Sequence, residues 1–315
     1  MRHGHLAPLW SLALAAALTA CAERPRAASP KPLAPLIPAS ETPQVFAPGV
    51  ISTAAPEFAI TFSPDGQTAY FNRASEDRQQ LGIYASQRVG GAWDSPVMAP
   101  FASPYRDVDP FMAPGGRRLY FSSTRPLVAG GAAGEFDTWY VERSGAGWSA
   151  PVHAGSVLNS APADVFVSLD REGMLYFSSS RDGTLRIYAS RPAGTGWTPP
   201  EKVPFEPNLS EGASNPLISR DGQILIYAAT RPDGLGGADL YVTCRRGEGW
   251  SQGQNLGPEI NSPFADFAPA LSPDGETFFF TSERPGITPA RQDGPRPPGD
   301  IYFVSARLVR RRCAL

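Results

Sequence analysis

The sequence predicts an all-β fold, a five-bladed β-propeller whose last blade is closed by an N-terminal strand. A short turn phrase recurs five times, about 50 residues apart, and each copy is flanked by runs rich in aromatic and β-branched residues. A period near 50 residues is typical of a repeat array, and runs of this composition favour strands. We find no stretch with a sustained helical period of apolar residues. The repeats therefore predict blades arranged around an axis.

The turn phrase ends in a glycine in every copy. The copies are "FSPDG", "MAPGG", "LDREG", "ISRDG" and "LSPDG", ending at Gly66, Gly116, Gly173, Gly222 and Gly275. In Ser-Pro-Asp-Gly, proline suits the position that needs φ near −65°, and glycine suits the position that needs positive φ. The phrase therefore predicts a tight hairpin turn between the first two strands of each blade.

Each repeat predicts four short strands. The second strand follows the turn, as in "RLYFSSTR", and the third carries a pattern such as "LRIYAS". The fourth follows a Gly-Trp pair in three repeats and Gly-Ala-Trp in the first. The fifth repeat has no Gly-Trp pair, but residues 42–50, "TPQVFAPGV", resemble the fourth strands of the first three blades. We expect this segment to complete the last blade and hide its open edge. The alternative is that it only ends the N-terminal linker.

Three segments carry a resemblance to a known family. "FSPDGQTAYF", "ISRDGQILIYAATRPDG" and "LSPDGETFFFTSERPG" resemble the WD40-like PD40 repeats of TolB-type propellers. The resemblance covers about residues 57–306, nearly the whole predicted folded part. It implies a periplasmic propeller that binds partner proteins. The additional N-terminal domain of TolB has no counterpart in this sequence, so the resemblance extends to the repeats alone.

The N-terminal segment predicts export and lipid attachment. Residues 1–20 read as a signal peptide, with a short basic start and an apolar run too short for a good membrane span. The run ends in "LTAC", which resembles the lipobox of bacterial lipoproteins and makes Cys21 the predicted lipid attachment site. Position 22 is Ala and not Asp, and the resemblance to Gram-negative lipoproteins then implies the outer membrane, on the periplasmic side. The alternative is an ordinary signal peptide cut nearby.

We therefore divide the chain into a signal peptide (1–20), a lipidated cysteine with a proline-rich tether (21–41), a propeller (42–309) and a tail (310–315). Contact with the membrane is expected through the lipid anchor only. Apart from Cys21, the cysteines are Cys244 and Cys313. They either form a disulfide or remain a buried thiol and a tail thiol, and we favour the second. The net charge of −2 and the lack of a basic stripe argue against nucleic acid.

The predicted binding surface lies on the face that holds the crossovers between blades, with the long loops 126–136 and 286–299. Acids precede the turn glycines, and arginines follow on the second strands. The candidate binding residues are Glu57, Asp107, Asp164, Glu211, Asp266, Arg73, Arg125, Arg181, Arg231 and Arg284. Charged groups and variable loops on a rigid scaffold are typical of a binding surface. The alternative is that acid and arginine form structural ion pairs across each hairpin.

No catalytic motif stands out. His153 falls on a predicted outermost strand, and no G-x-S-x-G, H-E-x-x-H, C-x-x-C or phosphate-binding loop occurs. We expect no cofactor and no metal, because the arginines disfavour a cation in the acid ring and should keep its carboxyls ionised. The predicted function is a non-catalytic cell-envelope lipoprotein that binds an envelope protein or a peptidoglycan or glycan partner. The alternative is a glycoside hydrolase or glycan-binding protein that uses a central carboxylate ring.

Overall fold

The computed structural model describes Met1 and residues 40–75, 77, 79–160, 162–204, 212–287 and 298–313. The predicted signal peptide, Cys21, nearly all of the tether, Glu211, and residues 288–297 of one long loop lie outside these residues. In the described part of the chain, no helix has the length and apolar character needed to span a membrane.

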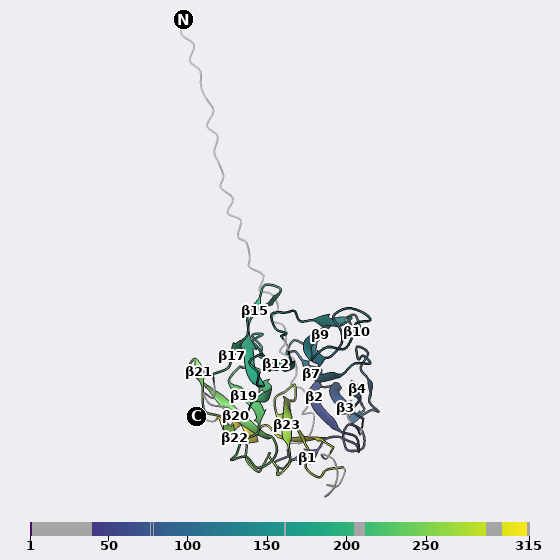
Figure 1. Ribbon diagram of the computed structural model, residues 1–315, viewed down its shortest axis with the longest axis vertical. Helices are drawn as coiled ribbons and strands as arrows, with labels where there is room; N and C mark the ends of the chain where they lie inside the picture. Colours follow the sequence, from purple (N-terminus) through teal and green to yellow (C-terminus); the bar gives the residue numbers. More distant parts are fainter. Residues whose placement is uncertain are drawn as a thin grey trace. The chain divides into compact units, whose positions relative to one another are not determined.

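Five antiparallel sheets form a ring, each one blade of a β-propeller, so the predicted fold class is confirmed (Figure 1). Along the ring, the innermost strand of every blade contacts the innermost strands of both neighbouring blades. These innermost strands are β2 (Glu57–Phe62), β7 (Asp107–Met112), β12 (Asp164–Leu169), β18 (Ser214–Ile218) and β23 (Asp266–Leu271).

The remaining strands follow the predicted order outwards from the centre. The second strands are β3 (Thr68–Ala74), β8 (Arg118–Ser123), β13 (Leu175–Ser179), β19 (Ile224–Ala229) and β24 (Thr277–Ser282). The third strands are β4 (Leu81–Val89), β9 (Asp137–Ser144), β14 (Arg186–Ser190), β20 (Asp239–Arg246) and β25 (Asp300–Ser305). The fourth strands of the first four blades are β6 (Val97–Met98), β11 (Val152–His153), β17 (Glu201–Lys202) and β22 (Gln254–Asn255).

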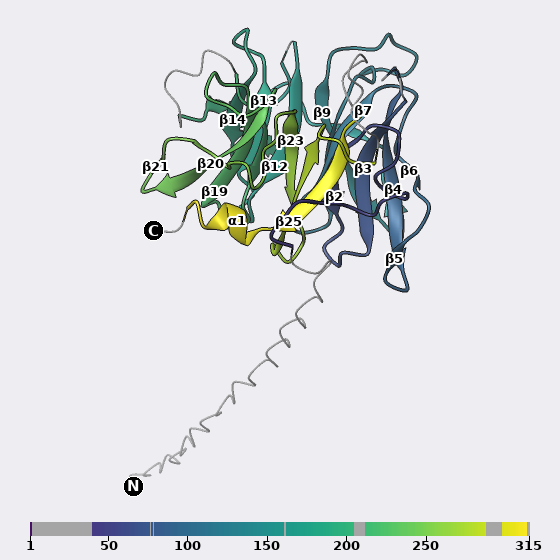
Figure 2. The same ribbon diagram turned by 90° about the horizontal axis from the view of Figure 1, so that it is seen from below.

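The Gly-Trp pairs, and Ala92–Trp93 at the same place in the first blade, form short strands of their own. Three of them, β5 (Ala92–Trp93), β10 (Gly147–Trp148) and β21 (Gly249–Trp250), extend the third strand of their blade as a hairpin, whereas β16 (Gly196–Trp197) pairs with β15 (Pro192–Ala193). These hairpins lie on the face that also holds the turns of the recurring phrase, as β5 shows in Figure 2. We call this the turn face, and the opposite one the crossover face.

The last blade is completed by the N-terminal strand, as the sequence predicts. Strand β1 (Gln44–Val45) pairs antiparallel with β25, with Gln44 opposite Phe303. Phe46 follows directly and is buried against Phe279 of β24, their ring centroids 5.1 Å apart. Ser52 adds a hydrogen bond in each direction with the backbone of Ile301. Residues 42–50 therefore belong to the propeller and not to the linker.

The C-terminal segment crosses the turn face from the last blade to the fourth. Helix α1 (Arg307–Arg310) buries Leu308 and Val309 in the same apolar cluster as the inner strands of both blades. Beyond it, Cys313 forms a disulfide with Cys244 at the end of β20. The favoured expectation of two free thiols is therefore wrong, because the helix carries the tail back to blade four. Residues 310–313 are anchored to the propeller.

Candidate functional site

The four described acids of the predicted ring are buried and bonded within the protein. Each begins an innermost strand, and none of the carboxylates has exposed surface. Each accepts hydrogen bonds from the backbone N–H and the hydroxyl of a serine or threonine four residues earlier, in the crossover. The pairs are Thr53 with Glu57, Ser103 with Asp107, Ser160 with Asp164 and Ser262 with Asp266. Buried anions of this kind are stable only when paired and hydrogen-bonded.

Each of these acids also pairs with the predicted arginine of its blade. The nitrogen–oxygen distances are 2.8 Å for Arg73–Glu57, Arg125–Asp107 and Arg284–Asp266, and 3.0 Å for Arg181–Asp164. The arginines reach further, to backbone carbonyls of the crossover, as Arg125 Nη2 does to Phe101 at 3.3 Å. The ion pairs expected as the alternative to a binding surface are thus present. They tie each crossover to the second strand of its own blade.

The register differs between blades, and the sequence pattern shows why. In the second, third and fifth blades, a serine lies opposite the acid and the arginine follows two residues later, as in Ser123 and Arg125. In the first blade, Arg73 itself lies opposite Glu57. In the fourth blade, Ala213 takes the place of the acid, and Arg231 donates to the Tyr227 hydroxyl at 2.7 Å. Glu211 lies outside the described residues, so its predicted place in the ring stays a prediction.

Protonation in the ring departs from the expectation at one position. Burial raises the pKa of Glu57 to about 7, although the hydrogen bonds from Thr53 and Arg73 lower it. For Glu57, removal from water therefore outweighs the attraction to the guanidinium, whereas from the sequence we expected the arginine to dominate.

A second ring of equivalent positions closes the axis of the propeller. Each innermost strand has one non-glycine residue in the left-handed region, and that residue lies within a bulge in the pairing: Ala59, Asp109, Phe166, Asn215 and Ala268. Three of them, Ala59, Phe166 and Ala268, are buried against one another. A left-handed conformation is unfavourable for a residue as bulky as Phe166. The Phe166 side chain is buried at the axis against Ala59 and Ala268, and this burial offsets the unfavourable backbone conformation.

The bulges also join neighbouring blades. The backbone N–H of four bulge residues donates to a side chain on the second strand of the preceding blade: Ala59 to Thr281, Asp109 to Asn72, Phe166 to Ser122 and Asn215 to Ser178. Asp109 is half-buried within this ring, and burial raises the pKa of its carboxyl to about 7. These bonds tie each of the four innermost strands to the preceding blade.

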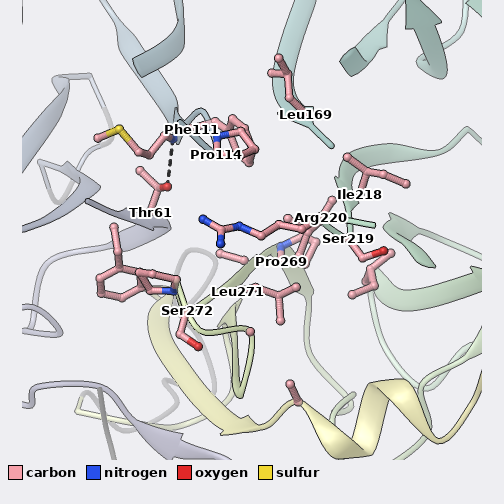
Figure 3. Close-up of a pocket in the computed structure, with 18 of the residues that line it drawn as sticks. Thr61, Phe111, Pro114, Leu169, Ile218, Ser219, Arg220, Pro269, Leu271 and Ser272 are labelled. Atoms are coloured by element: carbon pink, nitrogen blue, oxygen red, sulfur yellow. Dashed lines mark hydrogen bonds between the residues drawn. The ribbon is translucent and has the colours of Figure 1, made fainter. Parts of the chain in front are cut away.

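A cavity of about 320 Å³ opens on the turn face above this closed axis. All five innermost strands line it, Ala59 and Phe166 are at its inner end, and Val309 of α1 contributes to one side. Most of the lining is apolar, as the residues in Figure 3 show. The cavity is therefore a blind funnel on the face opposite to the predicted acid ring, and the sequence-based site prediction missed it.

The mouth of the funnel is formed by the recurring turns themselves. The residue two before each turn glycine lines the cavity: Pro64, Pro114, Arg171, Arg220 and Pro273. Proline at this position is replaced by arginine in the third and fourth copies of the phrase. That substitution is visible in the sequence, and it is the signal that could have located the site. It places a positive charge at the mouth where the other three copies have an apolar proline.

Arg220 differs from the other arginines that line the cavity. Arg171 pairs with Glu172 and Arg310 pairs with Glu276. Arg220 is exposed, and none of the described carboxylates or hydroxyls bonds its guanidinium. In Figure 3 its side chain extends across the cavity toward Thr61. The Thr61 hydroxyl accepts the N–H of Met112 at 3.0 Å, so its own hydrogen is left to donate.

Other chemistry-bearing groups lie apart from the funnel. His153 lies on the outermost strand β11, as predicted, where it contacts Asp137 at 3.1 Å and Asn159 at 2.7 Å. Among the residues that the structure describes, no group of three or more His, Cys, Asp or Glu side chains is arranged to hold a metal ion.

Known proteins resemble this chain only distantly. No known protein family and no curated protein matches the sequence. TolB from Acinetobacter baumannii is 14% identical, with a TM-score of 0.49 over 79% of this chain and 54% of that one. Putative TolB from Agrobacterium tumefaciens is 15% identical, with a TM-score of 0.45 over 81% and 76% of the two chains. The GH43B protein of the Bacteroides ovatus xyloglucan locus is 15% identical, with a TM-score of 0.49 over 84% and 54%. This chain spans about half the length of the Acinetobacter TolB. These similarities are distant and concern the β-propeller fold alone.

Proposed function

We propose that this protein is a lipid-anchored, non-catalytic binding protein of the cell envelope, a PD40-type propeller that recognises an envelope component in its turn-face funnel. The observation that carries the proposal is the funnel itself. It is a rigid, mostly apolar hollow lined by all five blades, with few polar groups at its mouth, which is the usual form of a ligand site.

The acid ring supports a binding function in another way. Both acid and base roles in a glycoside hydrolase need carboxyls that reach substrate. Here the four described acids have no exposed surface and are bonded to their own crossovers. The ring therefore serves to hold the crossovers, and we place the ligand at the opposite end of the axis.

Export and anchoring rest on the sequence. The apolar run that ends in "LTAC" favours lipidation of Cys21, and the Cys244–Cys313 disulfide is typical of an oxidising compartment. Radiolabelled palmitate should label the wild type and not Cys21→Ser. Labelling that persists in this variant would contradict the anchor.

The binding function is tested by capture from envelope extract. Leu271 is half-buried at the funnel, and Leu271→Trp should fill it and abolish capture of the bound component. Leu127→Trp is the matched control, because Leu127 is 66% exposed on a crossover-face loop. The opposite pattern, with loss only in Leu127→Trp, would move the site to the crossover face. Release of product from a glycan by the wild type, lost in Asp164→Asn, would replace the proposal with the glycoside hydrolase.

A further inference from the structure

Arg220 places a guanidinium at the mouth of the funnel. Arg220 stands where three other copies of the turn phrase have proline, and its guanidinium has no anionic partner among the described residues. A guanidinium presents a planar fork of donors that matches a carboxylate. The Thr61 hydroxyl lies on the side toward which this fork extends (Figure 3). Two donors, one in the turn between β18 and β19 and one on β2, therefore face one region of the cavity.

The remaining charges at the mouth limit the charge of a ligand. Asp221 and Asp274 also line the cavity. Each of them accepts the hydroxyl of the serine two residues earlier and the backbone N–H two residues later, which holds the carboxylates at the rim. Arg220 has no anionic partner among the described residues, and two carboxylates lie near the mouth, so a singly charged anion is favoured over a phosphate dianion.

The apolar interior of the funnel favours a ligand with an apolar body. Phe111, Leu217, Leu271 and Pro269 line its walls, and Phe166 lies at its closed end. Burial of each methylene group of a ligand there contributes about a fourfold gain in affinity. An apolar ligand without charge would leave Arg220 unused, and a small inorganic anion would leave the apolar walls in contact with water.

We propose that the funnel binds a small monocarboxylic acid with an apolar body, its carboxylate on Arg220 and Thr61 and its chain directed toward Phe166. This inference rests on the proposed function and names the ligand class of the same site. The ligand is a free acid of medium chain length, because the closed axis gives the chain no exit through the propeller.

The test is titration calorimetry with the full chain carrying Cys21→Ser, using hexanoate, octanoate, decanoate, decanol and inorganic phosphate. Affinity should rise about fourfold per methylene along the acids until the funnel is full. Decanol should bind about 10- to 100-fold more weakly than decanoate, and phosphate should not compete with it. Arg220→Met should weaken decanoate by the same factor and leave decanol unchanged.

Arg246→Met is the matched control. Arg246 is exposed at the end of β20, where β20 forms a hairpin with β21, and it does not line the cavity. It should bind decanoate as the wild type does. Equal affinity for decanoate and decanol, an Arg220→Met variant that binds decanoate normally, or absence of binding would each overturn the ligand class. If capture from extract still depends on Leu271 in that case, the binding function stands and only the ligand class fails.

Discussion

Replacing Asp266 by asparagine should destabilise the propeller by about 3–5 kcal/mol, the usual cost of removing one member of a buried ion pair. The Asp266 carboxylate is fully buried and accepts three hydrogen bonds, from the N–H and hydroxyl of Ser262 and from Arg284. An amide has the same shape, but its NH2 group would face donors and not acceptors. Arg284 would also keep its charge with 18% exposure and no counter-ion in the network.

The assay is urea and thermal unfolding, with Glu276→Gln as the control. Glu276 pairs with Arg310 at a similar distance of 2.8 Å, but its side chain is 59% exposed. Exposed pairs contribute about 0–1 kcal/mol. For a domain of this size, the loss at Asp266 corresponds to roughly 6–20 °C in melting temperature. The control should move by no more than a few degrees.

A second variant separates the two causes. If the stranded charge of Arg284 accounts for much of the loss, the double change Asp266→Asn with Arg284→Met should cost less than the sum of the single changes, by about 0.5–3 kcal/mol. The argument fails if Asp266→Asn unfolds like Glu276→Gln. In that event backbone hydrogen bonds alone hold the crossover, and the buried ion pairs do not contribute to stability.

Three further predictions concern other parts of the fold. Deletion of residues 42–50 should lower the melting temperature strongly because it removes β1, whereas deletion of residues 22–39 should leave it unchanged; equal and small effects would contradict strand closure. Replacing Cys244 and Cys313 together by serine should cost about 4 kcal/mol in urea unfolding, from the entropy of the 69-residue loop that the disulfide closes; a stability equal to the wild type would refute this. Folding raises the pKa of Asp109 to about 7, so the folded protein retains a proton that the unfolded chain releases near pH 4, and stability should fall as pH rises between these values; Asp109→Asn should flatten this slope, and parallel profiles would show that another group causes it.

Much of the fold was predictable because it depends on local chemistry. The turn glycines have positive φ at every recurring phrase, and the runs between them form strands in the predicted order. The closing strand was predictable from its likeness to the fourth strands. The disulfide was not, because the distance between Cys244 and Cys313 depends on where α1 turns the chain, and a four-residue helix has no period to detect.

The site was harder to place. Four of the predicted acids pair with the arginine of their blade at the crossovers. Their burial depends on the serine or threonine four residues before each acid, a pattern that has meaning only once the crossover is known to fold back on the strand. The funnel depends on Phe166, which closes the axis from a left-handed conformation that its residue type disfavours. Sequence patterns that reflect backbone preference cannot reveal a position where packing overrides that preference.

The junction between the N-terminal segment and the last blade also sets an order for folding. The bonds between Ser52 and Ile301 join positions 249 residues apart, so the first blade cannot gain its final neighbour until the last blade has been synthesised. In the unfolded chain, bringing such distant positions together costs about 5 kcal/mol of conformational entropy. The two residue pairs of β1 are too few to offset this, but burial of Phe46 and Ile51 beside it contributes about 3–6 kcal/mol. Ring closure is therefore the late, long-range step, and until it occurs the outer edge of β25 is an exposed strand on which a second nascent chain can pair.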